Sequence, residues 1–159
     1  YAKGGDALLD PAAVETLIRR LLPRAALITP NRREAEALSG LTIREPDDLA
    51  VAGRRLLELG PTAVLVKGGD LGGDMVTDWL IWRSGEEAFT APRLESRNTH
   101  GSGCTLASAI AVGLAQGLAL NAAVRRALAY VREAIRTAPS LGQGRGPLHH
   151  GHTVQPYAG

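Results

Sequence analysis

A glycine-rich turn precedes a long apolar segment in the stretch THGSGCTLAS, at positions 99–108. Gly101 and Gly103 permit backbone angles that other residues avoid, and they let a ligand approach the main chain closely. A helix that begins here directs its free N–H groups and its positive dipole end at that ligand, which favours an anion such as phosphate. A turn that merely starts a helix is an equally good interpretation. The P-loop and the Rossmann fingerprint are excluded, because their required residues are absent.

Cys104 is the single cysteine of the chain, and it lies where that helix is expected to begin. A free cysteine most often serves as a small buried hydrophobic residue. At a helix N-terminus, however, the thiolate form is stabilised, so Cys104 could act as a base near neutral pH. In this second interpretation, one turn binds the anion and activates the base.

Asn31 and Glu34 form a second candidate, at the start of a predicted helix that follows a strand. They fit a capping box, in which each side chain accepts a hydrogen bond from the other residue's backbone N–H. They also lie at the carboxyl end of a strand, where open α/β sheets bind ligands. There they could hold Mg²⁺ through water. The two interpretations are compatible.

Lys67 is the third candidate, because it closes the apolar run of VLVKGGD and precedes two glycines, Gly68 and Gly69. A lysine at this edge of a sheet suits a phosphate, and the alternative is a solvated strand end. The acidic glycine segment at 68–74 is interpreted as a loop between strands rather than a calcium site. A mobile tail is likewise preferred over a metal site for His149, His150 and His152.

The predicted elements alternate between helices and buried strands. Asp10 and Pro11 mark the first helix, and Asp47 is the predicted cap of the third. Apolar strands separated by helices predict an α/β fold with a mainly parallel sheet and no second domain. The helices are expected at 11–22, 31–38, 47–59, 103–116 and 121–137, and the strands at 25–29, 62–67, 74–82 and 86–90. The last two strands form a predicted hairpin, and the chain from residue 140 on is expected to be irregular.

The composition limits the class of protein. The chain of 159 residues has the size of one domain, and 45% hydrophobic residues suffice for a core. A net charge of +2 is too small to argue for nucleic acid or a membrane surface as a partner. No apolar run is long enough for a transmembrane helix. One cysteine cannot form an internal disulfide, which predicts a reducing, cytoplasmic location. Because the chain begins with tyrosine, we expect that an upstream segment is not included.

Four segments together carry a resemblance to a known family: TPNRREAEAL, VLVKGGD, NTHGSGCTLASAIAVGLAQG and GQGRGPLHH. In this order they resemble the hydroxymethylpyrimidine and phosphomethylpyrimidine kinases of thiamine biosynthesis, in the ribokinase-like superfamily. The resemblance implies a three-layer α/β/α fold, with a mainly parallel sheet flanked by helices, whose N-terminal half is missing. It further implies that residues 1–150 are the nucleotide-binding C-terminal portion of the kinase domain, and that 151–159 are an irregular tail.

The resemblance also implies roles for single residues. The family's anion hole, which stabilises the transferring phosphoryl group, is matched by Gly101, Ser102, Gly103 and Cys104. Cysteine stands where most ribokinase-like enzymes have an aspartate base. The family's motif that organises phosphates, and magnesium through water, is matched by Asn31 and Glu34. The residues that fall where the family contacts ATP are Lys67 and Gly69.

The function implied is that of an ATP-dependent kinase. Its substrates are 4-amino-5-hydroxymethyl-2-methylpyrimidine and the monophosphate of that compound. The expected cofactors are ATP and Mg²⁺, and the full-length protein is expected to be a homodimer without nucleic-acid or membrane partners. Two alternatives remain open at this point: a pyridoxal kinase of the cysteine-containing ribokinase-like group, and a non-catalytic fragment that only binds nucleotide.

Overall fold

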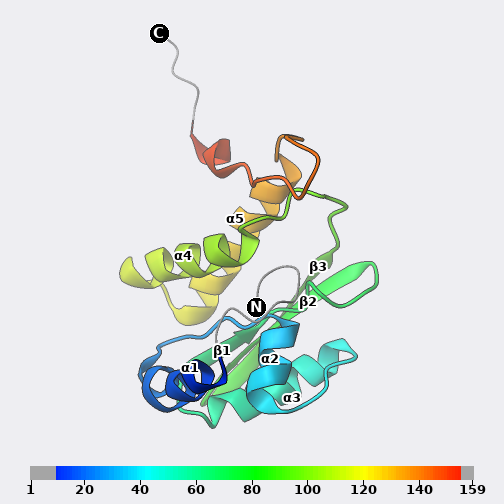
Figure 1. The fold of residues 1–159 in the computed structure, drawn as a ribbon. Coiled ribbons are helices and arrows are strands. Elements are labelled where there is room, and N and C mark those ends of the chain that lie inside the picture. Colours follow the sequence, from blue (N-terminus) through cyan, green and yellow to red (C-terminus); the bar gives the residue numbers. More distant parts are fainter. Residues whose placement is uncertain (1–9, 155–159) are drawn as a thin grey trace. The chain divides into compact units, whose positions relative to one another are not determined.

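The computed structural model describes residues 10–154 and divides the chain into two compact units, Tyr1–Arg93 and Leu94–Gly159 (Figure 1). The elements of the first unit are α1 (Pro11–Thr16), the π-helical η1 (Leu17–Leu21), the 3₁₀-helical η2 (Leu22–Arg24), α2 (Arg32–Ser39), α3 (Pro46–Leu57), β1 (Ala63–Val66), β2 (Met75–Trp82) and β3 (Gly85–Pro92). Those of the second unit are α4 (Ser102–Ala115), α5 (Leu120–Arg136) and the 3₁₀-helical η3 (His150–Thr153). Among the described residues, no helix has both the length and the apolar character needed to cross a membrane.

The sheet of the first unit has the order β1–β2–β3, and both pairings are antiparallel. The predicted hairpin of β2 and β3 is confirmed. All four residues of β1 are buried, as expected for a central strand. Within the described residues, the predicted parallel pairing is present only as two bridges on the other side of β1, from Ile28 to Val64 and from Asn31 to Lys67. The strand expected at 25–29 is therefore reduced to a bridge, since Pro30 has no N–H to extend the ladder.

The helix limits follow local capping chemistry. The Asp10 side chain accepts a hydrogen bond from the Ala13 N–H at 2.7 Å, which confirms the predicted start of α1. The prediction of Asp47 as the cap of α3 is wrong, because the N-cap is Glu45. Pro46 occupies the first helical position, where its fixed φ angle favours a helix start, so the helix begins earlier than predicted.

The core of the first unit lies between α3 and the sheet, with α2 packed against α3. Gly53 lets α3 come close to β2, since a Cβ atom there would lie 2.2 Å from Ile81 Cδ1. The core thus consists of small and aliphatic side chains, as the composition predicts. Its buried members are Ala35, Ile43, Leu49, Ala52, Leu56, Val64, Val66 and Ile81.

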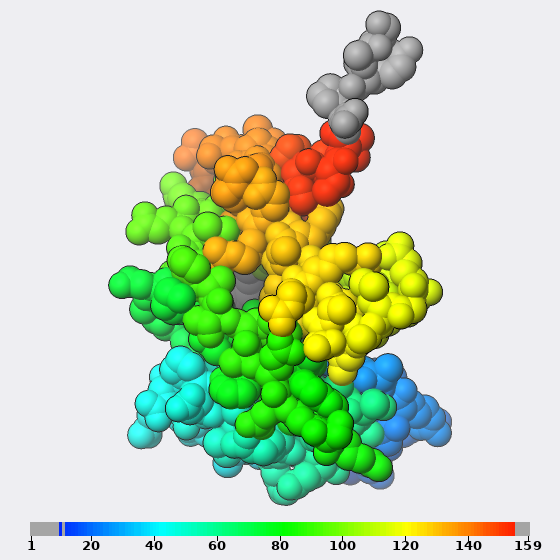
Figure 2. Space-filling view, turned by 180° about the vertical axis from the view of Figure 1, so that it is seen from behind, coloured from blue at the N-terminus to red at the C-terminus, as the bar shows by residue number. Residues whose placement is uncertain are grey.

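The second unit is built on the packing of α4 against α5. Gly113 permits a close approach of the two helices, because a Cβ atom at this position would lie 2.9 Å from the Cβ atom of Ala123. The connection between the helices lies at the surface, in yellow in Figure 2. Both helices agree with their predicted ranges to within one residue at each end.

The segment after α5 has little regular structure, as predicted, but it packs against its unit. Pro147 forms a parallel bridge with His100, and the Leu148 side chain is buried. The predicted irregular tail contains part of η3, which runs from His150 to Thr153. Its last part, 155–159, lies outside the described residues.

Candidate active site

The start of α2 holds Asn31 and Glu34 in a reciprocal arrangement. The Glu34 N–H donates to Asn31 Oδ1 at 2.9 Å, and the Asn31 N–H donates to Glu34 Oε2 at 2.8 Å. This geometry confirms the capping box. It also fixes both side chains at the helix N-terminus, where the dipole is positive. An amide oxygen and a carboxylate are oxygen ligands of the kind that Mg²⁺ takes, and magnesium characteristically keeps several waters and uses one or two carboxylates. The pair therefore fits a water-mediated magnesium site but not a complete protein cage.

Lys67 lies beside this helix start, although it is distant in sequence. It forms a parallel bridge with Asn31, and its N–H donates to the Pro30 carbonyl at 2.9 Å. The Lys67 side chain is half-buried, whereas Gly69, two residues on, is exposed. Within the first unit the structure thus brings together the predicted metal-binding and nucleotide-binding residues at one edge of the sheet.

Gly68 connects this edge to β2 through an interaction that sequence analysis missed. Its N–H donates to Asp78 Oδ1 at 2.8 Å, and the Asp78 side chain is buried. A Cβ atom on Gly68 would lie 2.0 Å from the Thr77 carbonyl oxygen, so only glycine fits here. The available signal was an aspartate in the middle of a mostly apolar strand, a position where a buried carboxylate requires a donor.

Arg93 is a second residue that sequence analysis missed. Its guanidinium donates to three carbonyl oxygens of the loop at 68–74, those of Gly69, Leu71 and Gly73. The prediction of a glycine loop rather than a calcium site agrees with these contacts, since an arginine occupies the carbonyls of the loop. No group of three or more His, Cys, Asp or Glu side chains suited to a metal ion occurs between residues 10 and 154.

The glycine turn lies in the second unit and opens α4. Gly101 is the N-cap, and its φ of 82° lies in the left-handed region that favours glycine. Gly103 differs from the prediction, because it lies inside α4 in ordinary helical conformation. The first turn of α4 carries no acidic side chain among the described residues, so nothing there neutralises the positive dipole end. These features suit an anion.

Cys104 is the third residue of α4, and its side chain is exposed. The interpretation of this cysteine as a buried hydrophobic residue is therefore wrong. The next N–H group, that of Thr105, donates to the Gly101 carbonyl at 2.9 Å and is the first helical hydrogen bond of α4. Of the three N–H groups that precede it, that of Ser102 donates to the Thr99 carbonyl at 3.3 Å, and those of Gly103 and Cys104 belong to the first turn, where N–H groups have no partner within the helix.

The segment that follows α5 contacts this glycine turn through Gly146 and His150. The His100 N–H donates to the Gly146 carbonyl at 3.2 Å, and a Cβ atom on Gly146 would lie 2.0 Å from Asn98 Oδ1. His150 Nε2 lies 2.9 Å from Thr105 Oγ1, which also donates to the Gly101 carbonyl at 2.9 Å. The resemblance predicted the importance of this segment, but its contacts with the glycine turn were not apparent from the sequence.

The three clustered histidines make different contacts with their unit, and the rings of His149 and His152 also meet edge-on at 6.3 Å. His149 Nδ1 lies 3.1 Å from Thr137 Oγ1, while the ring of His152 lies 4.6 Å from that of Tyr130 and is tilted by 43° against it. The Tyr130 hydroxyl donates to the His150 carbonyl at 3.0 Å. These contacts attach the segment to α5, so the expectation of a mobile tail at these histidines does not describe the structure.

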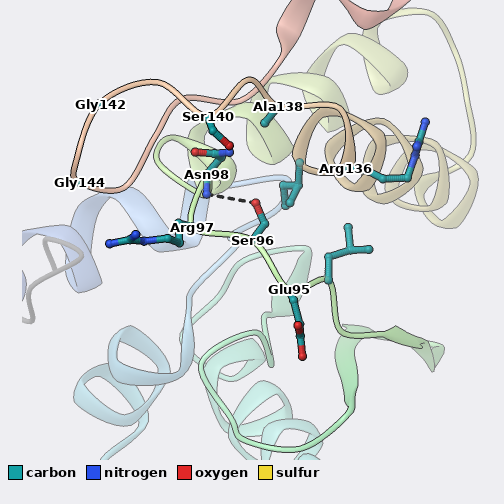
Figure 3. A pocket seen from close by; sticks show the side chains of 11 residues that line it. Glu95, Ser96, Arg97, Asn98, Arg136, Ala138, Ser140, Gly142 and Gly144 are labelled. Carbon is teal, nitrogen blue, oxygen red and sulfur yellow. Dashed lines mark hydrogen bonds between the residues drawn. The ribbon is translucent and has the colours of Figure 1, made fainter.

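A hollow of about 430 Å³ lies within the second unit (Figure 3). One wall is the segment that leads into the glycine turn, where the Asn98 N–H donates to Ser96 Oγ at 3.1 Å. The other wall follows the end of α5. There Arg136 donates two hydrogen bonds to Glu133, which hold the pKa of that carboxyl below its usual range and raise the pKa of the arginine. The lining is mixed in polarity and includes Glu95, Ser96, Arg97, Asn98, Ser140 and Gly144.

The fold is that of the ribokinase-like α/β proteins. The pyridoxal kinase from Staphylococcus aureus, solved in complex with AMP-PCP and pyridoxal, superimposes with a TM-score of 0.88 and 32% sequence identity. The match covers 96% of this chain and 57% of that kinase. The phosphomethylpyrimidine kinase from Clostridium difficile gives a TM-score of 0.72 at 40% identity, with 84% and 53% coverage.

The chain belongs to the phosphomethylpyrimidine kinase family, whose model matches residues 1–149. It is 46% identical to the hydroxymethylpyrimidine/phosphomethylpyrimidine kinase of Salmonella typhimurium over 154 residues, covering 95% of this chain and 58% of the relative. It is 50% identical over 150 residues to the thiamine biosynthesis bifunctional protein ThiED of Geobacter sulfurreducens, covering 94% of this chain and 30% of the relative. The chain therefore spans 58% of the length of the first of these curated relatives and 30% of the second.

Proposed function

We propose that the full-length protein is an ATP-dependent hydroxymethylpyrimidine/phosphomethylpyrimidine kinase, and that residues 1–150 are its nucleotide-binding portion. The observation that carries the proposal is the exposed Cys104 in the first turn of α4, directly after a left-handed glycine. A helix start of this kind stabilises negative charge on a transferring phosphoryl group. Cys104 lies in the same first turn, so the turn supplies an anion site and a candidate base together.

In the first step, the oxygen of the substrate hydroxymethyl group attacks the γ-phosphorus of ATP. A new O–P bond forms, the bond from the γ-phosphorus to the bridging oxygen breaks, and ADP leaves. The Cys104 thiolate takes the hydroxyl proton. In the second step the attacking group is an oxygen of the substrate monophosphate, which is mostly deprotonated near neutral pH. This step needs the base less, so one cysteine serves both.

The other residues bind and orient the nucleotide. Lys67 and the backbone at Gly69 contact the ATP phosphates, since both lie at the ligand edge of the sheet. Asn31 and Glu34 hold Mg²⁺ through water, and the metal supplies charge neutralisation for the phosphates when bound. The anion hole itself consists of the first-turn backbone of α4, from Gly101 to Cys104.

The test compares both phosphorylation steps in Cys104→Ala and in Ser108→Ala, a matched control. Ser108 is exposed on α4, one helical turn beyond Cys104. Cys104→Ala should slow alcohol phosphorylation by about a hundredfold or more, the usual scale for loss of a general base. Phosphorylation of the monophosphate should suffer less, and the serine variant should match the wild type. Equal losses in both steps would contradict the base role and favour a positioning role for the cysteine.

A pyridoxal kinase is the second candidate, and the similarity to the Staphylococcus aureus pyridoxal kinase favours it. Turnover of pyridoxal and of hydroxymethylpyrimidine by the same full-length preparation separates the two. A higher kcat/KM for pyridoxal would replace the pyrimidine assignment while leaving the kinase chemistry in place.

The third candidate is a chain that only binds nucleotide; the chain spans 58% of the length of the Salmonella typhimurium relative. Among residues 10–154, β3 of the first unit pairs with β2 on one side only, and such an edge tends to pair with other chains. Residues 1–159 made alone should therefore be oligomeric or aggregated and lack kinase activity. A soluble, active monomer of 1–159 would instead place the whole reaction in this half.

The proposal extends to the location of the enzyme in the cell and to its oligomeric state. A cytoplasmic location is supported by the presence of a single, exposed cysteine. The family resemblance supports a homodimer of the full-length protein. Light scattering on the purified protein tests the oligomeric state, and a monomeric mass would contradict it.

A further inference from the structure

Arg93 follows directly after β3 and reaches back to the loop at 68–74. Its Nη1 donates to the Gly69 carbonyl at 3.0 Å, and its Nε donates to the Gly73 carbonyl at 2.7 Å. Its Nη2 donates to the carbonyl of Leu71, which lies between the other two. The backbone N–H of Arg93 also donates to the Asp74 carbonyl at 2.7 Å. One residue therefore binds four carbonyl groups along a single loop.

This arrangement uses a property that arginine alone has among the side chains. The planar guanidinium carries five N–H donors in a fixed fork, so it can bind several carbonyls in set directions. The three carbonyls belong to alternate residues of the loop, and all described peptide bonds are trans. In a trans peptide the C=O and the N–H point in opposite directions. With these carbonyls turned to Arg93, the N–H groups of Asp70, Gly72 and Asp74 point away from it.

The start of the loop is held independently. The buried Asp78 carboxylate accepts the Gly68 N–H at 2.8 Å, one residue after Lys67. Glycine-rich segments otherwise sample many conformations, and loop residues 69, 70, 72 and 73 are exposed. Asp78 thus anchors the start of the loop, while Arg93 determines its course and its end.

We propose that Arg93 is a positioning residue for nucleotide binding. It holds the loop at 68–74 in one conformation. Lys67 and the Gly69 backbone can therefore contact the phosphates without a prior change in loop conformation. Arg93 acts through the loop, because its guanidinium is engaged with loop carbonyls. The inference rests on the proposed function, in which Lys67 and Gly69 contact ATP.

The experiment uses Arg93→Met and Arg93→Lys in the full-length protein. Arg83→Met is the matched control, because Arg83 is an exposed arginine at the turn between β2 and β3. Two quantities are measured well below each variant's melting temperature: the kinetic constants for ATP, and hydrogen exchange of the amides of residues 69–74. The exchange measurement does not depend on activity.

In Arg93→Met the loop amides should exchange faster, and the KM for ATP should rise about tenfold to a hundredfold with a smaller change in kcat, as expected for a misplaced binding group. Arg93→Lys should recover only part of both effects, since an ammonium is a point charge without the planar fork. Arg83→Met should match the wild type. If Arg93→Met fails to fold, the lysine variant carries the test.

Faster exchange without any change in the KM for ATP would overturn the proposal and leave Arg93 with a structural role only. Unchanged exchange in both variants would overturn it as well. If the wild-type protein neither binds nor consumes ATP, the proposed function fails and the nucleotide role of Arg93 fails with it. The exchange data would then still decide whether Arg93 orders the loop.

Discussion

Replacement of Gly68 by alanine should destabilise the protein far more than the same change at Gly72, although both glycines lie in one loop. The added Cβ atom at position 68 would lie 2.0 Å from the Thr77 carbonyl oxygen and 3.0 Å from Leu49 Cδ1. The oxygen belongs to the backbone of β2, which cannot move without disturbing the sheet. At position 72 no atom lies within 4 Å of the built Cβ atom, and the φ angle is not positive.

Two costs contribute to the expected loss. Overpacking of a buried site typically costs about 1–3 kcal/mol. Displacement of Gly68 would also lengthen its 2.8 Å hydrogen bond to Asp78. A buried acceptor that loses its donor costs about 1–3 kcal/mol. Asp78 has further interactions, so the second cost should fall near its lower limit. We therefore expect a loss of about 3 kcal/mol in the free energy of unfolding for Gly68→Ala. For Gly72→Ala we expect a change of about 0.5 kcal/mol or less.

Urea unfolding measures this difference. Both tryptophans of the chain, Trp79 and Trp82, lie in β2 close to Thr77, so their fluorescence reports on the affected region. With an m-value of about 2 kcal/mol/M, a loss of 3 kcal/mol lowers the midpoint by about 1.5 M urea. Circular dichroism of the folded variants controls for a change of fold. A Gly68→Ala midpoint within experimental error of the Gly72→Ala midpoint would refute the packing argument.

Three further predictions concern single side chains. Gly69→Ala should leave stability unchanged, since no atom lies within 4 Å of the built Cβ atom. It should nevertheless raise the KM for ATP if the backbone approaches the nucleotide, and an unchanged KM would remove Gly69 from the site. Glu34→Gln keeps an oxygen that can accept the Asn31 N–H, so it should cost about 1 kcal/mol or less in stability. It should raise the magnesium concentration for half-maximal rate, and an unchanged magnesium dependence would leave the capping role alone. Two backbone N–H groups hold the pKa of the Asp48 carboxyl below its usual range. The ionised form is favoured in the folded state, so this contribution is present at neutral pH and lost as the pH falls below about 4. The stability difference between wild type and Asp48→Asn, measured by urea unfolding, should shrink between pH 7 and pH 3, and a constant difference would contradict this assignment.

Features that depend on neighbouring residues could be predicted from the sequence. The capping box of Asn31 and Glu34 joins residues three positions apart, and helix formation alone brings them together. The same holds for the cap of α1 by Asp10 and for the left-handed Gly101 before α4. The cap of α3 was misassigned for an equally local reason, because Pro46 sets the helix start one residue after Glu45.

Pairing partners across the sheet were harder to predict. The apolar run of β1 indicates a buried strand, but burial on both faces does not determine the direction of the neighbour. The structure places the antiparallel β2 on one side of β1 and a short parallel contact from residues 28 and 31 on the other. The direction of each neighbouring strand is decided by how the chain returns to the sheet, and this depends on the segments that connect the strands.

Contacts between distant residues were decided by the tertiary structure alone. Arg93 binds carbonyls 20 to 24 residues earlier in the chain, and His150 contacts Thr105 across 45 residues. Asp78 reaches Gly68 only because β2 runs back beside β1. No residue type or spacing identifies such partners, since many donors and acceptors of the same kind occur in the chain. The sequence by itself determined which short segments form helix starts, turns and buried strands, because those depend on hydrogen bonds within a few residues. Only the packed fold decided which distant side chains stabilise those segments. Packing closes long loops at an entropic cost, and the burial of apolar surface offsets that cost.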